Sequence, residues 1–479
     1  MGDLDETIAA PITAAGHSAI SVVRISGPLT RQAIESLVVQ AKRVIDNPRK
    51  LMLVDIRHLK YSDYSHVEAE LLDSGMVVYF PRFRSFTGED SAEFNIHGSP
   101  FLVEKLLESL CACGLRLANP GEFCKRAFLN GKLDLVQAEA IADLIAAESE
   151  TQARAAKHQL AGALSAAISQ LGEQVKNCLA ELEAFIDFPE EDIETASEFA
   201  INLMLKEAVT AIDRLLESFR TGKLYREGAQ VVIVGYPNAG KSSILNRLVG
   251  EERAIVSQYA GTTRDAIEER ISLDGLLIRL WDTAGIIDST LPSDEVSRLN
   301  LMGVEQSWLR VENADLAVFV FDVTEDVDGL EKLFRQVIAK VNNVVAVGNK
   351  CDLLSEEQLI ELKLHVQEVF GAAEALEPLF VSATNGQGFR ELKRAIRGKL
   401  LMNSSASIGA IVTNFRHRDC LLEARKALEE GLSNLKASTA VELIASDIRQ
   451  ALSSLSDIIG VTSSEDILER IFSKFCIGK

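Results

Sequence analysis

A phosphate-binding loop follows a short apolar run near the middle of the 479-residue chain. In "QVVIVGYPNAGKSS", Gly235 and Gly240 belong to a G-x-x-x-x-G-K-S sequence that ends with Lys241 and Ser242. The backbone N–H groups of such a loop converge on phosphate oxygens, helped by the N-terminus of the helix that follows. The lysine would reach the β- and γ-phosphates, and the serine hydroxyl would ligate Mg²⁺. The sequence therefore predicts a strand, a loop and a helix, closed by a glycine at position 250, that bind a nucleoside triphosphate.

Two later motifs predict which base is bound. "VVAVGNKCDL" ends a buried strand with Asn349, Lys350 and, two residues on, Asp352. The Asp352 carboxylate can accept two hydrogen bonds from the N1–H and exocyclic amine of guanine, whereas adenine offers no such pair. In "PLFVSATNG", the backbone N–H groups of Ser382 and Ala383 can contact the guanine oxygen. The predicted ligand is therefore GTP rather than ATP, bound by a G domain.

Metal ligands are expected beside the phosphates. Asp282 ends a strand in "RLWDTAG", where it can hold Mg²⁺ through water, and Thr263 would be a second Mg²⁺ ligand beside Ser242. The Asn238 carbonyl in the phosphate-binding loop, beside exposed loop carbonyls, can ligate a monovalent cation, which would neutralise charge where other GTPases use an arginine finger. Ile286 stands where Ras-like proteins place a glutamine that orients water, so another group must orient it here.

The chain divides into four segments of different texture. Residues 1–130 mix short β-branched runs with Gly and Pro turns, which predicts an α+β unit. Residues 131–227 contain few Gly or Pro and repeat apolar residues every three or four positions, so long helices are expected there and again in residues 399–479. Residues 228–398 alternate strands with amphipathic helices, which is typical of a parallel sheet. We predict a multidomain α/β plus α protein whose G domain is inserted into one discontinuous helical domain.

Composition limits the partners and the compartment. The formal net charge is −20, which disfavours broad binding to nucleic acid, although a local basic patch at Lys125, Arg126 and Lys132 stays possible. The seven cysteines are odd in number and form no zinc pattern, so they are expected to be buried, reduced thiols. The acidic N-terminus is not a signal peptide, and the longest apolar run, Leu316–Val323, is too short to cross a bilayer. These features predict a cytoplasmic protein with no membrane partner.

On these motifs the chain resembles a known family, the bacterial tRNA uridine-modification GTPases called MnmE or TrmE. "GYPNAGKSS", "GTTRD", "DTAG" and "NKCD" are similar to the G domain of the family. "VVRISGP", "SFTGEDSAEF", "PGEFCKRAFLNGKLDLVQAEA", "IDFPEED" and the terminal "FCIGK" are similar to family signatures outside the G domain. The first four motifs alone also fit a ribosome- or RNA-associated regulatory GTPase, a switch without modification chemistry, and this alternative stays open.

The resemblance implies an architecture and a reaction. The N-terminal domain would bind folate and form a homodimer, and potassium-dependent pairing of TrmE-type G domains would drive GTP hydrolysis. A flavoprotein partner of the MnmG type, joined in a heterotetramer, would bring FAD and NADH. Together they would add an aminomethyl or carboxymethylaminomethyl group at C5 of the wobble uridine of certain tRNAs. A tetrahydrofolate derivative, either 5-formyl- or 5,10-methylene-tetrahydrofolate, would supply the one-carbon unit.

The motifs and the resemblance together assign site residues. The expected GTP-binding residues are Asn238, Ala239, Gly240, Lys241, Ser242, Ser243, Ser257, Gln258, Tyr259, Ala260, Gly261, Thr262, Thr263, Asp282, Thr283, Ala284, Gly285, Asn349, Lys350, Asp352, Ser382 and Ala383. By resemblance, potassium would be held by Asn238, Ser257, Tyr259 and Thr262, and magnesium by Ser242 and Thr263. The resemblance also implies that folate would be bound by Arg24, Glu93, Lys132 and Lys479.

The tail "CIGK" would dock into the folate pocket. Its terminal lysine suits prenylation poorly, and Cys476 would lie close to the one-carbon unit, where both packing and chemistry are open roles. One loop departs from the family: "TAAGHSAIS" stands where the family has a glycine-rich P-P-G-x-G-G stretch.

The water-orienting carboxylate is a second departure from the family. There a Glu lies three residues before the Gly of a short I-G-(I/V)-E-R stretch. The matching stretch here is "MGVEQ", and counting back three residues from Gly303 gives Asn300, whereas reading forward from "DEV" gives Ser297. Neither residue carries a carboxylate. The nearest carboxylate is Glu295, which we take as the candidate catalytic residue.

Overall fold

The computed structural model describes most of the chain as two compact units. The described residues are 5–62, 66–187, 196–252, 268–282, 307–326, 328–370, 377–402, 410–437, 439–461, 465–475 and 478. Unit 1 consists of residues 1–142, 165–201 and 430–479, and unit 2 consists of residues 143–164 and 202–429. Each unit is therefore discontinuous in sequence.

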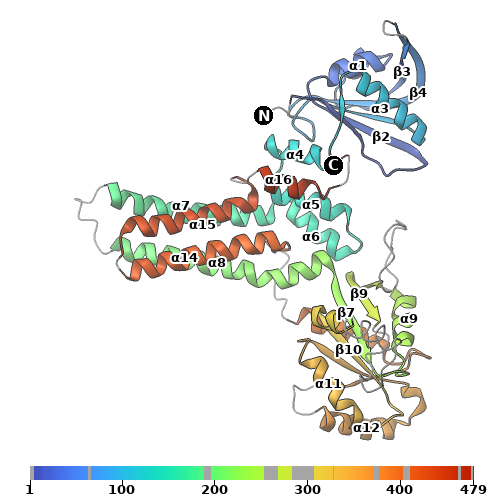
Figure 1. Ribbon diagram of the computed structural model, residues 1–479, viewed down its shortest axis with the longest axis vertical. Helices are drawn as coiled ribbons and strands as arrows, with labels where there is room; N and C mark the ends of the chain where they lie inside the picture. The colour runs from blue at the N-terminus through green and yellow to red at the C-terminus, as the bar shows by residue number, and fades with distance from the viewer. Residues whose placement is uncertain are drawn as a thin grey trace, which may run out of the picture. The chain divides into compact units, whose positions relative to one another are not determined.

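The N-terminal part of unit 1 is a six-stranded sheet with helices packed on it (Figure 1). The strand order is β3-β4-β5-β2-β1-β6, and all neighbours are antiparallel except β1 and β6. The strands are β1 (Ile8–Pro11), β2 (Ser18–Ser26), β3 (Met52–Ser62), β4 (His66–Phe80), β5 (Ser91–Gly98) and β6 (Arg116–Leu117), and the helices are α1 (Thr30–Leu37), α2 (Ala41–Ile45) and α3 (Pro100–Ala112). Alternate residues such as Ile25, Phe94 and Ile96 pack with Ile34 and Leu106 in one core. This is the predicted α+β unit.

Helices dominate the two predicted helical segments. They are α5 (Leu135–Ile145), α6 (Glu150–Leu160), α7 (Ala163–Asp187), α8 (Ala196–Glu227), α14 (Phe415–Lys436), α15 (Val441–Ile459) and α16 (Glu465–Phe472), while α4 (Glu122–Leu129) precedes the first segment. In unit 1, α7 lies beside α15, and Arg449 pairs with Glu183 at 2.8 Å (Figure 1). In unit 2, α8 lies beside α14, with the rings of Phe219 and Phe415 5.1 Å apart. Helix α15 ends at Ile459, and Gly460 directly after it has a φ of 90°, the left-handed conformation of a glycine C-cap.

A second six-stranded sheet forms the core of unit 2. Its order is β12-β11-β10-β7-β9-β8, and only the β8–β9 pair is antiparallel. The strands are β7 (Ala229–Gly235), β8 (Glu268–Leu273), β9 (Leu276–Asp282), β10 (Leu316–Asp322), β11 (Val344–Asn349) and β12 (Leu379–Val381), and the helices are α9 (Lys241–Glu252), α11 (Glu331–Ile338), α12 (Glu356–Val369) and α13 (Phe389–Leu401). Every residue of β10 and β11 is buried, because apolar clusters cover both faces of the sheet. The predicted, mainly parallel sheet is therefore confirmed.

One helix end and three cysteines differ from the predictions. Helix α9 continues to Glu252, so Gly250 lies inside it rather than closing it. Gly250 is not among the positive-φ glycines, so its backbone needs no helix stop there. Cys124, Cys178 and Cys351 are buried as expected, but Cys111 is exposed, and Cys113 and Cys420 are half-buried.

The β8–β9 hairpin is fastened to helix α6 within unit 2. The backbone N and the hydroxyl of Thr151 both donate to Gly275 O, at 3.1 and 2.7 Å. Arg270 Nη1 donates to Glu148 Oε1 at 2.6 Å. The start of strand β9 is therefore fixed by a helix as well as by its neighbouring strands.

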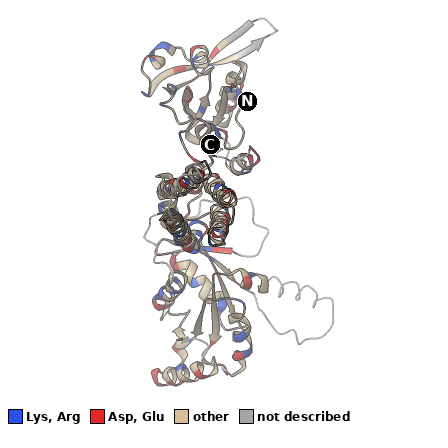
Figure 2. Cartoon of the chain, turned by 90° about the vertical axis from the view of Figure 1, so that its left-hand side faces the viewer, with Lys and Arg blue, Asp and Glu red and all other residues tan. Residues whose placement is uncertain are grey.

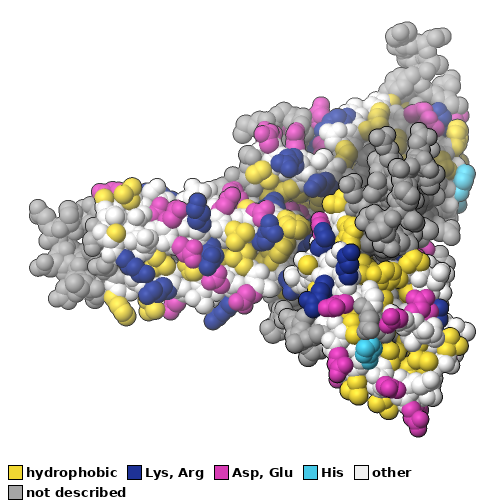
Figure 3. Space-filling model, turned by 60° about the horizontal axis from the view of Figure 1, so that its bottom comes forward, with side chains coloured by type: hydrophobic (Ala, Val, Ile, Leu, Met, Phe, Trp, Pro, Cys, Tyr) yellow, Lys and Arg dark blue, Asp and Glu magenta, His cyan; other side chains and the backbone are white. Residues whose placement is uncertain are grey.

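Charged residues of both signs are spread along the chain. Lys and Arg (blue) and Asp and Glu (red) are scattered along the coloured parts of the ribbon in Figure 2, and the two signs are interspersed on the surface at the left of Figure 3. No helix in the described ranges is long and apolar enough to cross a membrane.

Candidate functional site

A pocket of about 500 Å³ lies at the carboxyl ends of the parallel strands in unit 2. It is lined by Asn238, Gly240, Lys241, Ser242, Ser243, Asn349, Lys350, Asp352, Leu353, Ala383 and Thr384. The structure thus brings together three segments that the sequence analysis assigned to one nucleotide. Leu353 and Thr384 were not predicted.

The phosphate-binding loop turns tightly before helix α9. Asn238 and Gly240 both have positive φ, 61° and 88°, and the Asn238 side chain is exposed. Lys241 is 8% exposed, and its Nζ donates to Gly235 O at 3.0 Å and to Tyr236 O at 2.8 Å. Burial lowers the pKa of Lys241, although the Asp282 carboxylate acts in the opposite direction. A buried ammonium group that rests on neutral carbonyls is suited to bind an anion.

Asn349 joins the phosphate-binding loop to the loop after strand β12. Its Nδ2 donates to Ala239 O at 2.9 Å, and its Oδ1 accepts from Ala383 N at 3.2 Å. Arg247, which the sequence analysis missed, donates from Nη1 to Ala383 O and Thr384 O, both at 3.1 Å. No local pattern marks Arg247, because its partners lie about 136 residues away. These bonds fix the positions of the backbone groups at the expected base site.

Lys350 is held by a buried carboxylate at the end of strand β10. It has a φ of 67°, and its Nζ pairs with Asp322, which is 4% exposed. Burial alone would raise the pKa of Asp322, but hydrogen bonds from Lys350 and Thr324 outweigh burial and lower it. Asp352 is exposed, so its carboxylate is accessible to a base in the pocket.

Ser242 and Asp282 form an oxygen-rich corner beside the phosphate-binding loop. Ser242 Oγ donates to Asp282 Oδ2 at 2.7 Å. Asp282 Oδ1 is buried and has no hydrogen-bond partner among the described residues. A hydroxyl and an unpaired carboxylate oxygen are hard donors of the kind that Mg²⁺ prefers. The donor set present here therefore fits magnesium.

Several predicted site residues lie outside the described residues. They are Ser257, Gln258, Tyr259, Ala260, Gly261, Thr262, Thr263, Thr283, Ala284, Gly285, Glu295, Cys476 and Lys479.

Two of the residues expected to bind folate are neighbours on the N-terminal sheet. Arg24 on β2 and Glu93 on β5 are register partners, and Arg24 Nε and Nη2 donate to Glu93 Oε1 at 3.0 and 2.8 Å. The Arg24 guanidinium also lies 5.3 Å from the ring centre of Phe86 and 5.8 Å from that of Phe123. Lys132 Nζ donates to Phe83 O at 2.9 Å, on the loop that carries Phe86. The two aromatic rings were not predicted.

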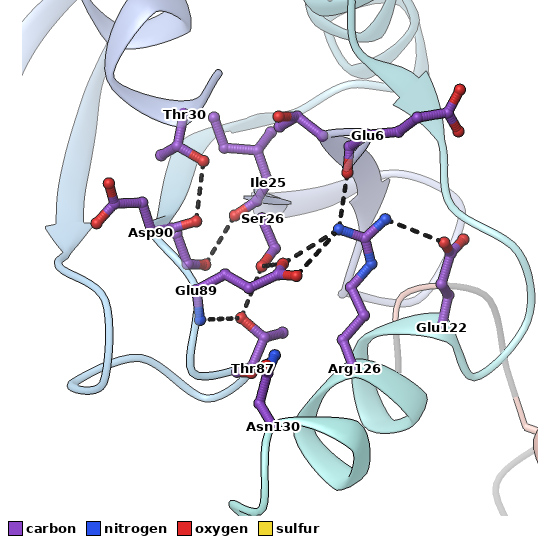
Figure 4. A network of polar contacts seen from close by, with 12 residues as sticks. Glu6, Ile25, Ser26, Thr30, Thr87, Glu89, Asp90, Glu122, Arg126 and Asn130 are labelled. Atoms are coloured by element: carbon purple, nitrogen blue, oxygen red, sulfur yellow. Dashed lines mark hydrogen bonds and ion pairs between the residues drawn. The ribbon is translucent and has the colours of Figure 1, made fainter. Parts of the chain in front are cut away.

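A buried polar network fixes the loop at residues 81–90 (Figure 4). Glu89 accepts from Ser26 Oγ at 2.7 Å and from Arg126 Nη1 at 3.1 Å. Arg126 is 1% exposed and also donates to Glu122 at 3.3 Å. Arg126 therefore cannot belong to a surface basic patch, and that prediction is wrong for this residue. The spacing of basic residues in the sequence did not indicate that the carboxylates of Glu89 and Glu122 bind the Arg126 side chain in the protein interior.

The C-terminal tail returns to the N-terminal sheet. Phe472 and Phe475 are buried in a cluster with Cys124 and Phe128. Gly478 has a φ of 94°, and a Cβ added there would lie 2.2 Å from Pro11 O, at the end of β1. The tail thus approaches the strand closely at a position that only glycine allows.

Comparison with known proteins identifies relatives of both units. One family model, the N-terminus of the GTP-binding protein TrmE, matches residues 7–132, and another, the MnmE helical domain, matches residues 135–476. The chain is 40% identical over 482 residues to the tRNA modification GTPase MnmE of Opitutus terrae, covering 100% of both chains. Similar solved structures include a variant of Aquifex aeolicus Era bound to GDP·AlF4⁻, at 26% identity over 42% of this chain and 66% of that one, with a TM-score of 0.29. The G domain of the T. maritima FeoB iron transporter matches at 24% identity over 36% of this chain and 98% of that one, with a TM-score of 0.26.

Proposed function

The chain belongs to the MnmE family of tRNA modification GTPases, and on that premise we propose that it hydrolyses GTP in a reaction that modifies the wobble uridine of tRNA. The observation that carries the GTPase part is the pocket lined by Lys241, Asp352 and Ala383, which come from three separate motifs. No single motif forms such a pocket, because its walls come from the ends of different strands.

The residues of this pocket suggest their roles. Lys241, now bonded to two backbone carbonyls, would turn to the β- and γ-phosphates. Asp352 would accept from guanine, while Asn349 holds Ala383 N–H near the guanine oxygen. Ser242, with Asp282 and Thr263, would hold Mg²⁺, which neutralises charge that develops on the phosphates.

Potassium dependence is a further part of the proposal. Asn238 has an exposed side chain on a left-handed turn, so its carbonyl oxygen is available to a cation. Together with Ser257, Tyr259 and Thr262, it would hold K⁺ beside the phosphates in a pair of G domains. Glu295 would orient the attacking water.

We also propose the domain organisation and the partners of the family. Residues 1–130 would bind a tetrahydrofolate derivative and dimerise, residues 131–227 and 399–479 would form the helical domain, and residues 228–398 would form the G domain. The folate would lie against Arg24, Glu93, Lys132 and Lys479. An MnmG-type flavoprotein with FAD and NADH would complete the reaction at C5 in the cytoplasm.

Nucleoside analysis tests the proposed reaction directly. We expect tRNA from cells that lack this protein to lose a C5-substituted wobble uridine, and expect the wild-type gene, but not a Lys241→Ala variant, to restore it. Unchanged nucleosides would refute the modification function. A regulatory GTPase without modification chemistry would in addition show no saturable binding of 5-formyltetrahydrofolate.

Hydrolysis in two salts tests the cation. GTP hydrolysis by the full-length protein should be faster in KCl than in NaCl of the same ionic strength, because Na⁺ is smaller and would fit the expected ligands poorly. Equal rates would exclude a potassium site at Asn238.

A further inference from the structure

The loop that follows strand β4 presents an exposed phenylalanine among arginines. Phe83 is 71% exposed, and the Arg82 guanidinium lies 5.0 Å from the centre of its ring. Tyr79 brings two more arginines close: Arg31 Nε donates to its hydroxyl at 2.8 Å, and Arg49 N donates to its carbonyl at 2.7 Å. With Arg84, these residues form a surface that we call the Phe83 patch, consisting of Arg31, Arg49, Arg82, Phe83 and Arg84. All five side chains are exposed.

The Phe83 patch carries an excess of positive charge. Two carboxylates, those of Asp90 and Glu35, interact electrostatically with the patch, and both interact with the Arg31 guanidinium. Asp90 Oδ1 is already bonded to the Tyr79 hydroxyl at 2.7 Å and to the Arg82 backbone N at 2.8 Å. Among the described residues, the side chains of Arg49, Arg82 and Arg84 form no ion pair. This is unusual in a chain with a net charge of −20, and it leaves three guanidinium groups available to an anionic partner.

Two residues of the patch have an unfavourable backbone conformation. In the described part of the chain, five residues other than glycine have positive φ: Arg49, Phe83, Asn238, Asp274 and Lys350. Asn238 and Lys350 line the nucleotide pocket, whereas Arg49 and Phe83 belong to the Phe83 patch. Positive φ is an outlier for a bulky side chain such as phenylalanine, and such outliers cluster at functional sites.

The surrounding structure maintains this conformation. Phe83 N donates to Gly88 O at 3.0 Å, and Lys132 Nζ donates to Phe83 O at 2.9 Å. The same loop is fixed at Glu89 by the buried network of Figure 4. A rigid loop therefore holds an apolar ring in solvent, where the ring contributes nothing to the stability of the fold. Because the ring is already fixed in place, less entropy is lost when a flat partner stacks on it.

We propose that the Phe83 patch binds the tRNA substrate, with Phe83 stacked on an unpaired base and the arginines on the neighbouring phosphates. Exposed aromatic rings and arginine guanidinium groups are the contacts that proteins use for unstacked bases, and arginine binds phosphate in a bidentate manner. The patch adjoins the expected folate site, because Phe86 of the same loop contacts Arg24. This inference rests on the proposed function.

Binding of a fluorescent tRNA transcript to the full-length protein tests the inference. Phe83→Ala should weaken binding about 5- to 150-fold, the range for loss of one stacked base, without changing the salt dependence. Arg82→Gln with Arg84→Gln should also weaken binding, and should reduce the slope of log affinity against log salt by about 1.4, because each single-strand phosphate contact contributes about 0.7.

Matched controls separate this role from general effects. Phe101 on α3 is 62% exposed and also has a cation nearby, Lys105 Nζ at 5.9 Å, so Phe101→Ala controls for Phe83→Ala. Arg390→Gln with Arg394→Gln, both exposed on α13, controls for the change in charge. All of these variants should retain the basal GTP hydrolysis rate.

Four results would overturn the inference. The first is a tRNA affinity that Phe83→Ala leaves unchanged, and the second is an equal loss of affinity in the control variants. The third is loss of the dimer in sedimentation, which would make this face a subunit interface. The fourth is wild-type protein that does not bind tRNA. The nucleoside analysis decides the proposed function separately, because it needs no direct binding of tRNA by this chain alone.

Discussion

Gly240→Ala should disable the nucleotide pocket while leaving the fold in place. Gly240 has a φ of 88°, and a Cβ built there would lie 2.1 Å from Asn349 Nδ2. The left-handed backbone costs about 1–2 kcal/mol for a residue with a Cβ. Moving the amide breaks its bonds to Ala239 O and Ala383 N, each worth about 0.5–1.5 kcal/mol. The total is about 2–5 kcal/mol, and even the lower figure corresponds to about thirtyfold in affinity.

The matched control is Gly250→Ala on the helix that follows. Nothing lies within 4 Å of a Cβ built at Gly250, and the residue lies inside helix α9. Alanine is favoured over glycine in a helix by about 0.5–1 kcal/mol, so this variant should bind normally and melt at the same or a higher temperature. Titration of each full-length variant with a fluorescent GTP analogue measures the affinities. If Gly240→Ala binds as tightly as Gly250→Ala, our account of the phosphate-binding loop is wrong.

Four further variants test other parts of the site. Asp352→Asn should shift preference from GTP towards xanthosine triphosphate, as competition binding would show, because the C2 carbonyl of xanthine can accept from an amide. Gly478→Ala should weaken 5-formyltetrahydrofolate binding in calorimetry and spare GTP hydrolysis, since its Cβ would clash with a carbonyl of β1. Asp322→Asn should lower the free energy of unfolding by about 1.5–3 kcal/mol, the value of a hydrogen bond to a charged group, here Lys350. Because the pKa of Asp322 is lowered, this loss of stability should be present in thermal melts above about pH 4 and should vanish at more acidic pH. Glu295→Ala should slow single-turnover hydrolysis in potassium about tenfold or more, and an unchanged rate would leave Asn300 or the cation to position water.

The nucleotide pocket was predictable because its chemistry lies at the ends of strands. Asp282 and Asn349 were each expected at the carboxyl end of a strand, and β9 and β11 end at these residues. In a parallel sheet those ends meet at one edge, so motifs distant in sequence converge without further information. The three- and four-residue spacing of apolar side chains also predicted the helices, since this spacing indicates which face of a helix is buried.

The N-terminal site was less predictable because it depends on strand pairing. Arg24 and Glu93 were expected to contact a ligand, yet their strands pair in a register that joins them to each other. Likewise, Arg126 looked like a surface cation in the sequence, and it is buried because Glu89 arrives from a loop 37 residues away. The sequence shows that a residue is charged, but it does not show which residue the charge pairs with. The strand register and the path of the loops determine that partner.

The position of Asp282 depends on contacts at both ends of strand β9. At its start, Thr151 of α6 holds Gly275 through two hydrogen bonds. At its end, Ile233 of β7 is the register partner of Asp282, whose Oδ2 accepts from Ser242. The other carboxylate oxygen of Asp282 is buried and, among the described residues, unpaired, which costs about 1–3 kcal/mol of stability. If strand β9 were fixed only at one end, a small shift of the strand could expose or pair that oxygen and remove the cost. The anchored strand thus maintains an unpaired oxygen where the proposed Mg²⁺ would be bound, at the expense of stability, as expected for a preorganised site.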